Sequence, residues 1–285
     1  MEPHSQFISV NGIKLHIADW GGKGPDLLLL HANGFLGRVY RRMIGHLIEH
    51  HHVRTLDWRG QGDSEKPPLE QCRWSDMALD VEGVIEQLGL RDFYGVGHSG
   101  GGALLALYAA THPGRVKSLA LLEPVTVPHE PAFLARLSTD NHPLVERTLR
   151  RRIVWESREQ LFAAYQGKDA FAGWQEEVLW DYVNHGTYPL PDGRIALKCP
   201  AEVEAQVFAD TMSLDIFSQV DKIDCPVLIL RGEHTDAPIA LIAERTARRI
   251  PQGALLTIPD TSHFLAMEQP EEVAVIIKNY FHAGR

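Results

Sequence analysis

The segment "GVGHSGGG", residues 95–102, constrains the fold of this chain more than any other stretch. A strand-like apolar run precedes Ser99, and an Ala- and Leu-rich run typical of a helix follows it. A serine on such a sharp strand-to-helix turn adopts a strained backbone. Side chains at 97 and 101 would collide with the adjoining strand and helix, which explains the glycines. The pattern G-x-S-x-G in this context therefore predicts a nucleophilic serine displayed at the turn.

The same glycines permit two other interpretations, a plain strand-to-helix turn and a phosphate cradle. The glycine spacing matches neither G-x-G-x-x-G nor the lysine-containing phosphate loop, which disfavours the cradle. At the start of the following helix the first N–H groups have no helical partner, and that of Gly100 is among them. We expect this N–H to stabilise an oxyanion.

Strand-like and helix-like runs alternate along most of the chain. Strands are predicted within 26–34, 51–64, 93–99, 116–124, 225–234 and 254–260, and helices within 39–50, 74–88, 101–114, 239–250 and 270–281. This alternation indicates an α/β fold with a mostly parallel, doubly wound sheet. Short alternating runs on either side of Asn11-Gly12 predict an antiparallel hairpin at the beginning of the chain.

The alternation stops between about 127 and 217, where aromatic and charged residues recur at helical spacing and strand-like runs are absent. We therefore predict a core formed by residues 1–127 and 217–285, with a helical cap inserted at 128–216. Most cap aromatics should pack the cap helices on one another, and some should face the catalytic edge of the sheet. These aromatics are Trp155, Phe162, Tyr165, Phe171, Trp174, Trp180 and Tyr182.

Composition narrows the classes of partner. The formal net charge of −9 at pH 7 disfavours a nucleic-acid partner, because such binders concentrate basic residues on one face. The one basic cluster, "RTLRRR" at 147–152, is interpreted as a solvated helix face. Three cysteines, an odd number, predict free thiols in a reducing compartment. Because the chain starts without a leader-like segment and has no long apolar run, we expect a cytoplasmic protein with no membrane span.

A serine hydroxyl needs a neighbouring base to become a good nucleophile. Among fifteen histidines we favour His263, which follows the last predicted strand on a loop at the same sheet edge as Ser99. The base needs a carboxylate that holds its tautomer. Asp236, just beyond a buried strand, is the first choice, and Glu123, at the end of another strand, is the alternative because it emerges at the same edge. Glu233 is interpreted as a loop residue.

At this point the sequence resembles a known family. The motifs "HANGF", "DWRGQGDS", "GHSGG", "RGEHTD" and "SHF" occur in the order, and roughly at the spacing, seen in the α/β-hydrolase fold superfamily. The resemblance implies that fold with a helical cap. It also implies a triad of Ser99, Asp236 and His263 in the chain order of that family. Asp57 and Arg59 match a turn that is usually structural there.

The resemblance further implies that a second oxyanion donor comes from the loop after the third strand, which often begins His-Gly. Here the loop reads "HANGF", residues 31–35, so Ala32 stands where the glycine is usual. The donor is then the N–H of Asn33 or of Phe35, and the register without a gap favours Asn33. Phe35 and His98, which lie beside these groups in the sequence, are predicted to contact the substrate.

We therefore expect a serine hydrolase that cleaves a small-molecule carboxylic ester of small to medium, apolar character through an acyl-enzyme. Neither a metal nor an organic cofactor is required by this mechanism. Hydrolysis of carbon–carbon bonds, lactones or amides, and perhydrolysis, stay open because the fold does not choose among them. Haloalkane dehalogenases and epoxide hydrolases of this fold carry an aspartate where this chain has Ser99. A non-catalytic, ligand-binding relative is the remaining alternative.

Overall fold

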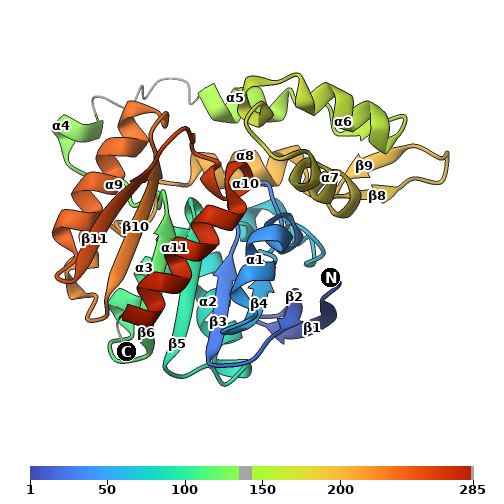
Figure 1. Ribbon diagram of the computed structural model, residues 1–285. Coiled ribbons are helices and arrows are strands. Elements are labelled where there is room, and N and C mark those ends of the chain that lie inside the picture. The colour runs from blue at the N-terminus through green and yellow to red at the C-terminus, as the bar shows by residue number, and fades with distance from the viewer. Residues whose placement is uncertain (135–142, 284–285) are drawn as a thin grey trace.

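The computed structural model describes residues 1–134 and 143–283. Its centre is an eight-stranded sheet with the order β1-β2-β4-β3-β5-β6-β10-β11 (Figure 1). The strands are β1 (His4–Val10), β2 (Ile13–Gly21), β3 (Asp26–Leu30), β4 (His52–Leu56), β5 (Phe93–His98), β6 (Val116–Leu122), β10 (Val227–Gly232) and β11 (Gly253–Ile258). Strand β2 pairs antiparallel with β1 and β4, and the remaining pairs are parallel. The α/β class with a mostly parallel sheet is thereby confirmed.

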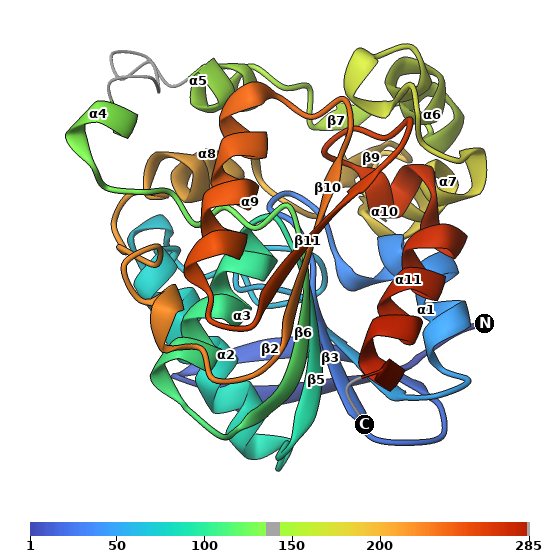
Figure 2. The same cartoon turned by 60° about the vertical axis from the view of Figure 1, so that its left-hand side comes forward.

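Helices cover both faces of this sheet (Figure 2). Helices α1 (Arg41–Leu47) and α11 (Pro270–Ala283) lie on one face, and α2 (Trp74–Gln87), α3 (Gly100–Thr111) and α9 (Ala237–Arg249) lie on the other. Within β3, Leu27 and Leu29 pack into the first layer while Leu28 and Leu30 pack into the second. Because successive strand side chains point to opposite faces, a strand buried on both faces is a continuous apolar run.

The first two strands form the hairpin that the sequence predicts. Asn11 and Gly12 occupy its turn with φ of 49° and 81°. Positive φ at both central residues is the requirement of the type I′ turn, whose twist matches that of the strands it joins. Asn and Gly adopt this conformation with little strain, so the local sequence is sufficient to specify the turn.

A cap-like region is inserted between β6 and β10 and lies over one edge of the sheet (Figure 1). Its helices are α4 (Pro131–Leu134), α5 (Pro143–Leu149), α6 (Arg158–Gln166), α7 (Glu176–His185) and α8 (Ala201–Ala209). The sequence predicts no strands here, and that expectation is wrong. Strands β7 (Val154–Trp155), β8 (Thr187–Pro189) and β9 (Ile195–Leu197) form a small antiparallel sheet. Strands of two or three residues are too short to produce a recognisable alternation.

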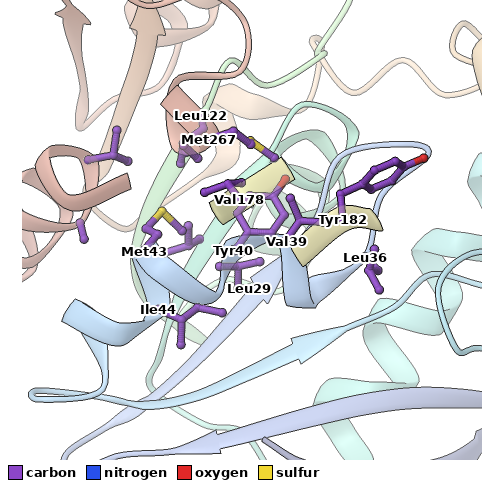
Figure 3. Packing of buried hydrophobic residues seen from close by; sticks show 14 of the residues in the cluster. Leu29, Leu36, Val39, Tyr40, Met43, Ile44, Leu122, Val178, Tyr182 and Met267 are labelled. Carbon is purple, nitrogen blue, oxygen red and sulfur yellow. The ribbon is translucent and has the colours of Figure 1, made fainter. Parts of the chain in front are cut away.

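The inserted region shares its packing with the core. Figure 3 shows Val178 and Tyr182 of α7 beside Val39 and Tyr40, which precede α1, and Met267 of α10 (Leu265–Glu268). On the other side of the insertion, the indole N–H of Trp74 in α2 donates to the carbonyl of Val207 in α8 at 2.9 Å. Because α8 of the inserted region packs against core residues, the cap boundaries at 128 and 216 stay a prediction.

Single-turn 3-10 helices complete the described elements: η1 (Gly37–Tyr40), η2 (Leu69–Gln71), η3 (Asp169–Phe171) and η4 (Val220–Lys222).

The basic run at 147–152 is only partly the solvated face that the sequence suggests. The side chain of Arg150 is 81% exposed, but that of Arg151 is 16% exposed and forms an ion pair with Glu204 of α8. Arg151 therefore joins two parts of the inserted region. The three cysteines are all buried, free thiols, as expected. In the described part of the chain, no helix combines the length and apolar character needed to cross a membrane.

Candidate active site

Ser99 occupies the strand-to-helix turn that the sequence predicts, between β5 and α3. Its φ is 54° and its ψ is −117°, a conformation that a non-glycine residue rarely adopts. A Cβ atom at Gly97 would lie 2.6 Å from the carbonyl oxygen of Gly101, and one at Gly101 would lie 2.4 Å from that of Leu30. Glycine is therefore required on both sides by direct contact with backbone. The turn leaves the Ser99 side chain at the N-terminus of α3.

His263 follows β11, and its ring nitrogen Nδ1 lies 2.6 Å from Oε2 of Glu123. Glu123 follows β6 directly, is completely buried and has a φ of 45°. Its Oε1 accepts the N–H of Gly232 at 2.7 Å, and Oε2 accepts the hydroxyl of Thr235 at 2.7 Å. Because a carboxylate only accepts, a neutral His263 donates its Nδ1 proton to Glu123. Its Nε2 is then left without a proton and can act as a base.

Asp236, the first-choice acid of the sequence, does not contact His263. It directly precedes α9 as its N-cap residue and is exposed to solvent. The loop that carries it does reach the His263–Glu123 pair, but through Thr235, while Gly232 at the end of β10 supplies a further contact. Glu233 is exposed and accepts the N–H of Asp260, in agreement with its interpretation as a loop residue. The structure thus pairs His263 with the alternative acid, Glu123.

His98, for which substrate contact stays a prediction, is enclosed by the protein. The residue is 1% exposed, and both ring nitrogens have partners within the protein. Nε2 lies 2.9 Å from the carbonyl oxygen of His263 and therefore carries the proton, since a carbonyl only accepts. Nδ1 then accepts the hydroxyl of Tyr40 at 2.8 Å, and this hydroxyl oxygen accepts the N–H of Ala32 at 3.1 Å. His98 thereby connects the loop after β3 with the loop that carries His263.

Burial, together with the nearby imidazole of His263, holds the pKa of His98 well below its usual value of 6.5. The unfolded chain therefore binds a proton at this residue at a pH where the folded protein does not. Consequently the free energy of unfolding falls as pH falls below about 6.5, by up to about 1.4 kcal/mol per pH unit.

We expect the His98→Gln variant to lose this part of the pH dependence. Urea unfolding at about pH 7, 6 and 5 measures it, by comparing the slope of unfolding free energy against pH with that of the wild type. His234→Gln removes an imidazole that is 63% exposed and serves as the control, with an unchanged slope. Equal slopes for the wild type and the His98 variant would contradict the expectation.

The loop after β3 is fixed by Gln61, a residue for which the sequence predicts no role. The buried Gln61 accepts the N–H of Gly34 at 2.8 Å and donates to Oδ1 of Asn33 at 2.8 Å. The side-chain amide of Asn33 donates in turn to the carbonyl of Glu204 at 3.0 Å.

The backbone N–H groups of this loop differ in their partners. The N–H of Phe35 donates to the carbonyl of Ala32 at 3.2 Å and closes a turn. Within 1–134 and 143–283, the N–H of Asn33 has no acceptor, which favours it over Phe35 as an oxyanion donor. The sequence signal that could have pointed to this role of Gln61 is its position within the motif "DWRGQGDS".

The rest of the "DWRGQGDS" turn has structural contacts. Asp57 accepts the N–H groups of Gly37 and Asp63 and a hydrogen bond from His16. Burial opposes ionisation, but this hydrogen bond and the charge of His16 lower the pKa of Asp57 to about 2.

Two clusters of described residues bring potential metal ligands together: His16, Asp57 and Asp63, and the exposed Glu233, His234 and Asp260. Neither cluster includes Ser99, His263 or Glu123.

An aromatic cluster joins the inserted region to the loops around Ser99. The ring of Phe35 lies 5.4 Å from that of Trp174, 5.5 Å from that of Tyr182 and 5.8 Å from that of Phe264. Phe264 adjoins His263, so this cluster begins directly beside the base. Phe171 packs on Trp174 and Phe264 as well. In contrast, Phe162 and Trp180 stack on each other within the inserted region, 4.2 Å apart.

The chain is similar to known proteins over most of its length. The model of the alpha/beta hydrolase family matches residues 27–276. A 2-(acetamidomethylene)succinate hydrolase of Mesorhizobium japonicum is 24% identical over 283 residues, which cover 98% of this chain and 95% of that protein. A pimeloyl-[acyl-carrier protein] methyl ester esterase of Chromobacterium violaceum is 28% identical over 264 residues, which cover 87% of this chain and 91% of that protein.

Among solved structures, that of an E-2-(acetamidomethylene)succinate hydrolase superposes with a TM-score of 0.82. It is 22% identical and covers 98% of this chain and 99% of its own, which shows that the two share a fold. The family match spans the sheet from β3 to β11, the serine turn and the inserted region. This chain therefore belongs to the alpha/beta hydrolase family.

Proposed function

We propose that this protein is a serine hydrolase that cleaves carboxylic esters of small to medium, apolar molecules. The observation that carries the proposal is the 2.6 Å contact between Nδ1 of His263 and the buried carboxylate of Glu123. A base held in this way, on a loop at the edge of the sheet where Ser99 follows β5, has the partner and the tautomer that nucleophile activation requires.

The chemistry follows from these groups. The Ser99 hydroxyl oxygen attacks the ester carbonyl carbon while Nε2 of His263 takes its proton, and buried Glu123 stabilises the imidazolium that forms. The N–H groups of Gly100 and Asn33 stabilise the oxyanion. Collapse of the intermediate breaks the ester bond, and His263 returns the proton to the leaving alcohol. Water, activated by the same base, then releases the acid and restores Ser99.

Ester cleavage is favoured within the chemistry of the family by the name of a relative, because the Ser99 nucleophile would serve each of these reactions. One relative aligned over most of its length bears the name of a methyl ester esterase. Hydrolysis of carbon–carbon bonds, lactones or amides stays the alternative, since the same groups serve those reactions.

Substrate preference is expected to follow the aromatic cluster of Phe35, Phe171, Trp174, Tyr182 and Phe264. An apolar acyl or aryl group packs against such rings, whereas a carboxylate loses its hydration there. We expect a higher kcat/KM for p-nitrophenyl hexanoate than for mono-p-nitrophenyl glutarate, which shares its leaving group and approximate length. Initial rates over a range of substrate concentrations measure this, and an equal or higher value for the glutarate would contradict it.

A substitution in the cluster extends the same test. Phe35→Ala should shift the preference between these two esters by roughly 1–3 kcal/mol, because the lost contact is made with only the apolar one. Trp180→Ala, which removes an aromatic stacked on Phe162 away from Phe35, is the matched control.

A fluorophosphonate probe, which labels an activated serine covalently, reports the nucleophile independently of the ester chosen. Failure of both turnover and labelling would favour a non-catalytic ligand-binding protein.

A further inference from the structure

We propose that Thr235 is a positioning residue for the acid of the triad, fixing the orientation of the Glu123 carboxylate and moderating the negative charge that it presents to His263. This inference rests on the proposed function, because it assigns Glu123 and His263 their roles. Thr235 itself touches neither a substrate nor the reacting atoms.

Thr235 contacts the same carboxylate oxygen of Glu123 that faces His263. Its hydroxyl donates to Oε2 of Glu123 at 2.7 Å, and the same oxygen lies 2.6 Å from Nδ1 of His263. The other oxygen, Oε1, accepts the N–H of Gly232 at 2.7 Å. Since the Glu123 side chain is completely buried, these three donors replace water around a charged group. The hydroxyl of Thr235 and the backbone N–H of Gly232, the last residue of β10, thus hold one carboxylate oxygen each.

The position of Glu123 in the fold explains why its carboxylate needs these hydrogen bonds. Glu123 stands just after β6 with a φ of 45°, and its own N–H donates to the carbonyl of Leu230 in β10 at 2.8 Å. The backbone of Glu123 is therefore fastened to the neighbouring strand. The side chain must still span the space between β6 and the loop that carries His263. Thr235, from the loop after β10, selects the rotamer in which Oε2 faces His263.

Donation to Oε2 also has an electrostatic consequence. A hydrogen bond stabilises the ionised form of a carboxylate and draws part of its charge away from other partners. Without the hydroxyl, Oε2 would offer more negative charge to His263 and favour the imidazolium. The imidazolium cannot act as a base, so removing the hydroxyl should move the acid limb of the pH–rate profile to higher pH.

Other titratable groups around the pair are already engaged or exposed. On β5, the ring of His98 lies 5.1 Å from that of His263, and burial keeps it neutral. On α10, Glu268 accepts the N–H and hydroxyl of Ser262. The remaining groups on the two loops are solvent-exposed: Glu233, His234, Asp236 and Asp260. Arg231 of β10 is paired with Glu244 of α9.

The test compares Thr235→Val, which keeps the shape and removes the hydroxyl, with Thr235→Ser, which keeps the hydroxyl. For Thr235→Val we expect kcat/KM on p-nitrophenyl hexanoate to fall roughly 10- to 100-fold, through kcat, as for loss of a hydrogen bond to a charged group. The midpoint of the acid limb should rise by about half a pH unit or more. Thr235→Ser should stay within about threefold of the wild type with an unchanged midpoint. Thr235→Ala serves as a second hydroxyl-free variant if valine disturbs folding.

A readout independent of turnover is the NMR titration of the His263 ring. Its midpoint should rise in Thr235→Val and Thr235→Ala and stay unchanged in Thr235→Ser. If the wild type is active and both hydroxyl-free variants keep its kcat/KM and its titration midpoint, the role of Thr235 is overturned. If the titration shifts as expected but the wild type cleaves no ester and Ser99 resists the fluorophosphonate, the contact is upheld and the proposed function fails instead.

Discussion

Replacing Ser99 with alanine is expected to lower kcat on p-nitrophenyl hexanoate by a factor on the order of 10⁵ to 10⁶, the scale seen when the serine of such a triad is removed. The reason is that no acyl-enzyme can form, while the oxyanion donors and the substrate contacts remain. The fold should be retained, because alanine preserves the Cβ atom and the backbone of the turn and removes only the hydroxyl.

Steady-state kinetics with a highly purified variant measures this effect, and circular dichroism verifies the fold. Ser118→Ala is the matched control. Ser118 lies in β6 and donates to the carbonyl of Pro226 at 3.0 Å, away from the turn, so its loss should leave kcat almost unchanged. A fluorophosphonate adduct should map to Ser99 in the wild type. More than a tenth of the wild-type activity in Ser99→Ala would show that another group is the nucleophile.

The second large effect concerns the acid, and its expected direction comes from the structure. Glu123→Gln should lower kcat by a factor on the order of 10⁴, as for the equivalent change of acid to amide in a serine triad. An amide cannot stabilise the imidazolium. It also offers only one oxygen to the three donors that converge on Glu123 from Gly232, Thr235 and His263. One of these donors is therefore left without an acceptor.

Asp236→Asn is the matched acid-to-amide control for this experiment. Asp236 is exposed and has no contact with His263, so its variant should stay within about twofold of the wild type, the range expected for a surface substitution. Melting temperatures of both variants separate a loss of catalysis from a loss of folding. If Asp236→Asn proves more damaging than Glu123→Gln, the pairing of His263 with Glu123 is not the one used in catalysis.

Much of the fold could be predicted from the sequence because the signals are local. The type I′ turn at Asn11-Gly12 depends on two residues that tolerate positive φ. The strands buried on both faces, such as β3, reveal themselves as unbroken apolar runs. The small sheet of β7, β8 and β9 had no such signal. Its strands have only two or three residues and are held in place by their neighbours.

The candidate site likewise combines features that local sequence predicts with features that depend on tertiary contacts. The turn at Ser99 was predictable because its glycines avoid contacts with backbone only a few residues away or on the next strand. The roles of Gln61 and His98 were not, because each depends on which loops meet. Gln61 contacts Asn33 and Gly34, and His98 contacts Tyr40 and His263, partners that are distant in the sequence for each.

The sequence by itself determined the serine turn, the order of strands and helices and the position of His263 after the last strand. It also placed two carboxylates near the sheet edge, Glu123 at the end of one predicted strand and Asp236 just beyond another. Only the tertiary structure decides which of them contacts His263. Glu123 turns inward with a positive φ and is completely buried against His263, whereas Asp236 directly precedes a helix and faces solvent. Both strands end at the same edge of the sheet, so the choice depends on where each backbone turns after its last residue, and three-dimensional packing sets that direction.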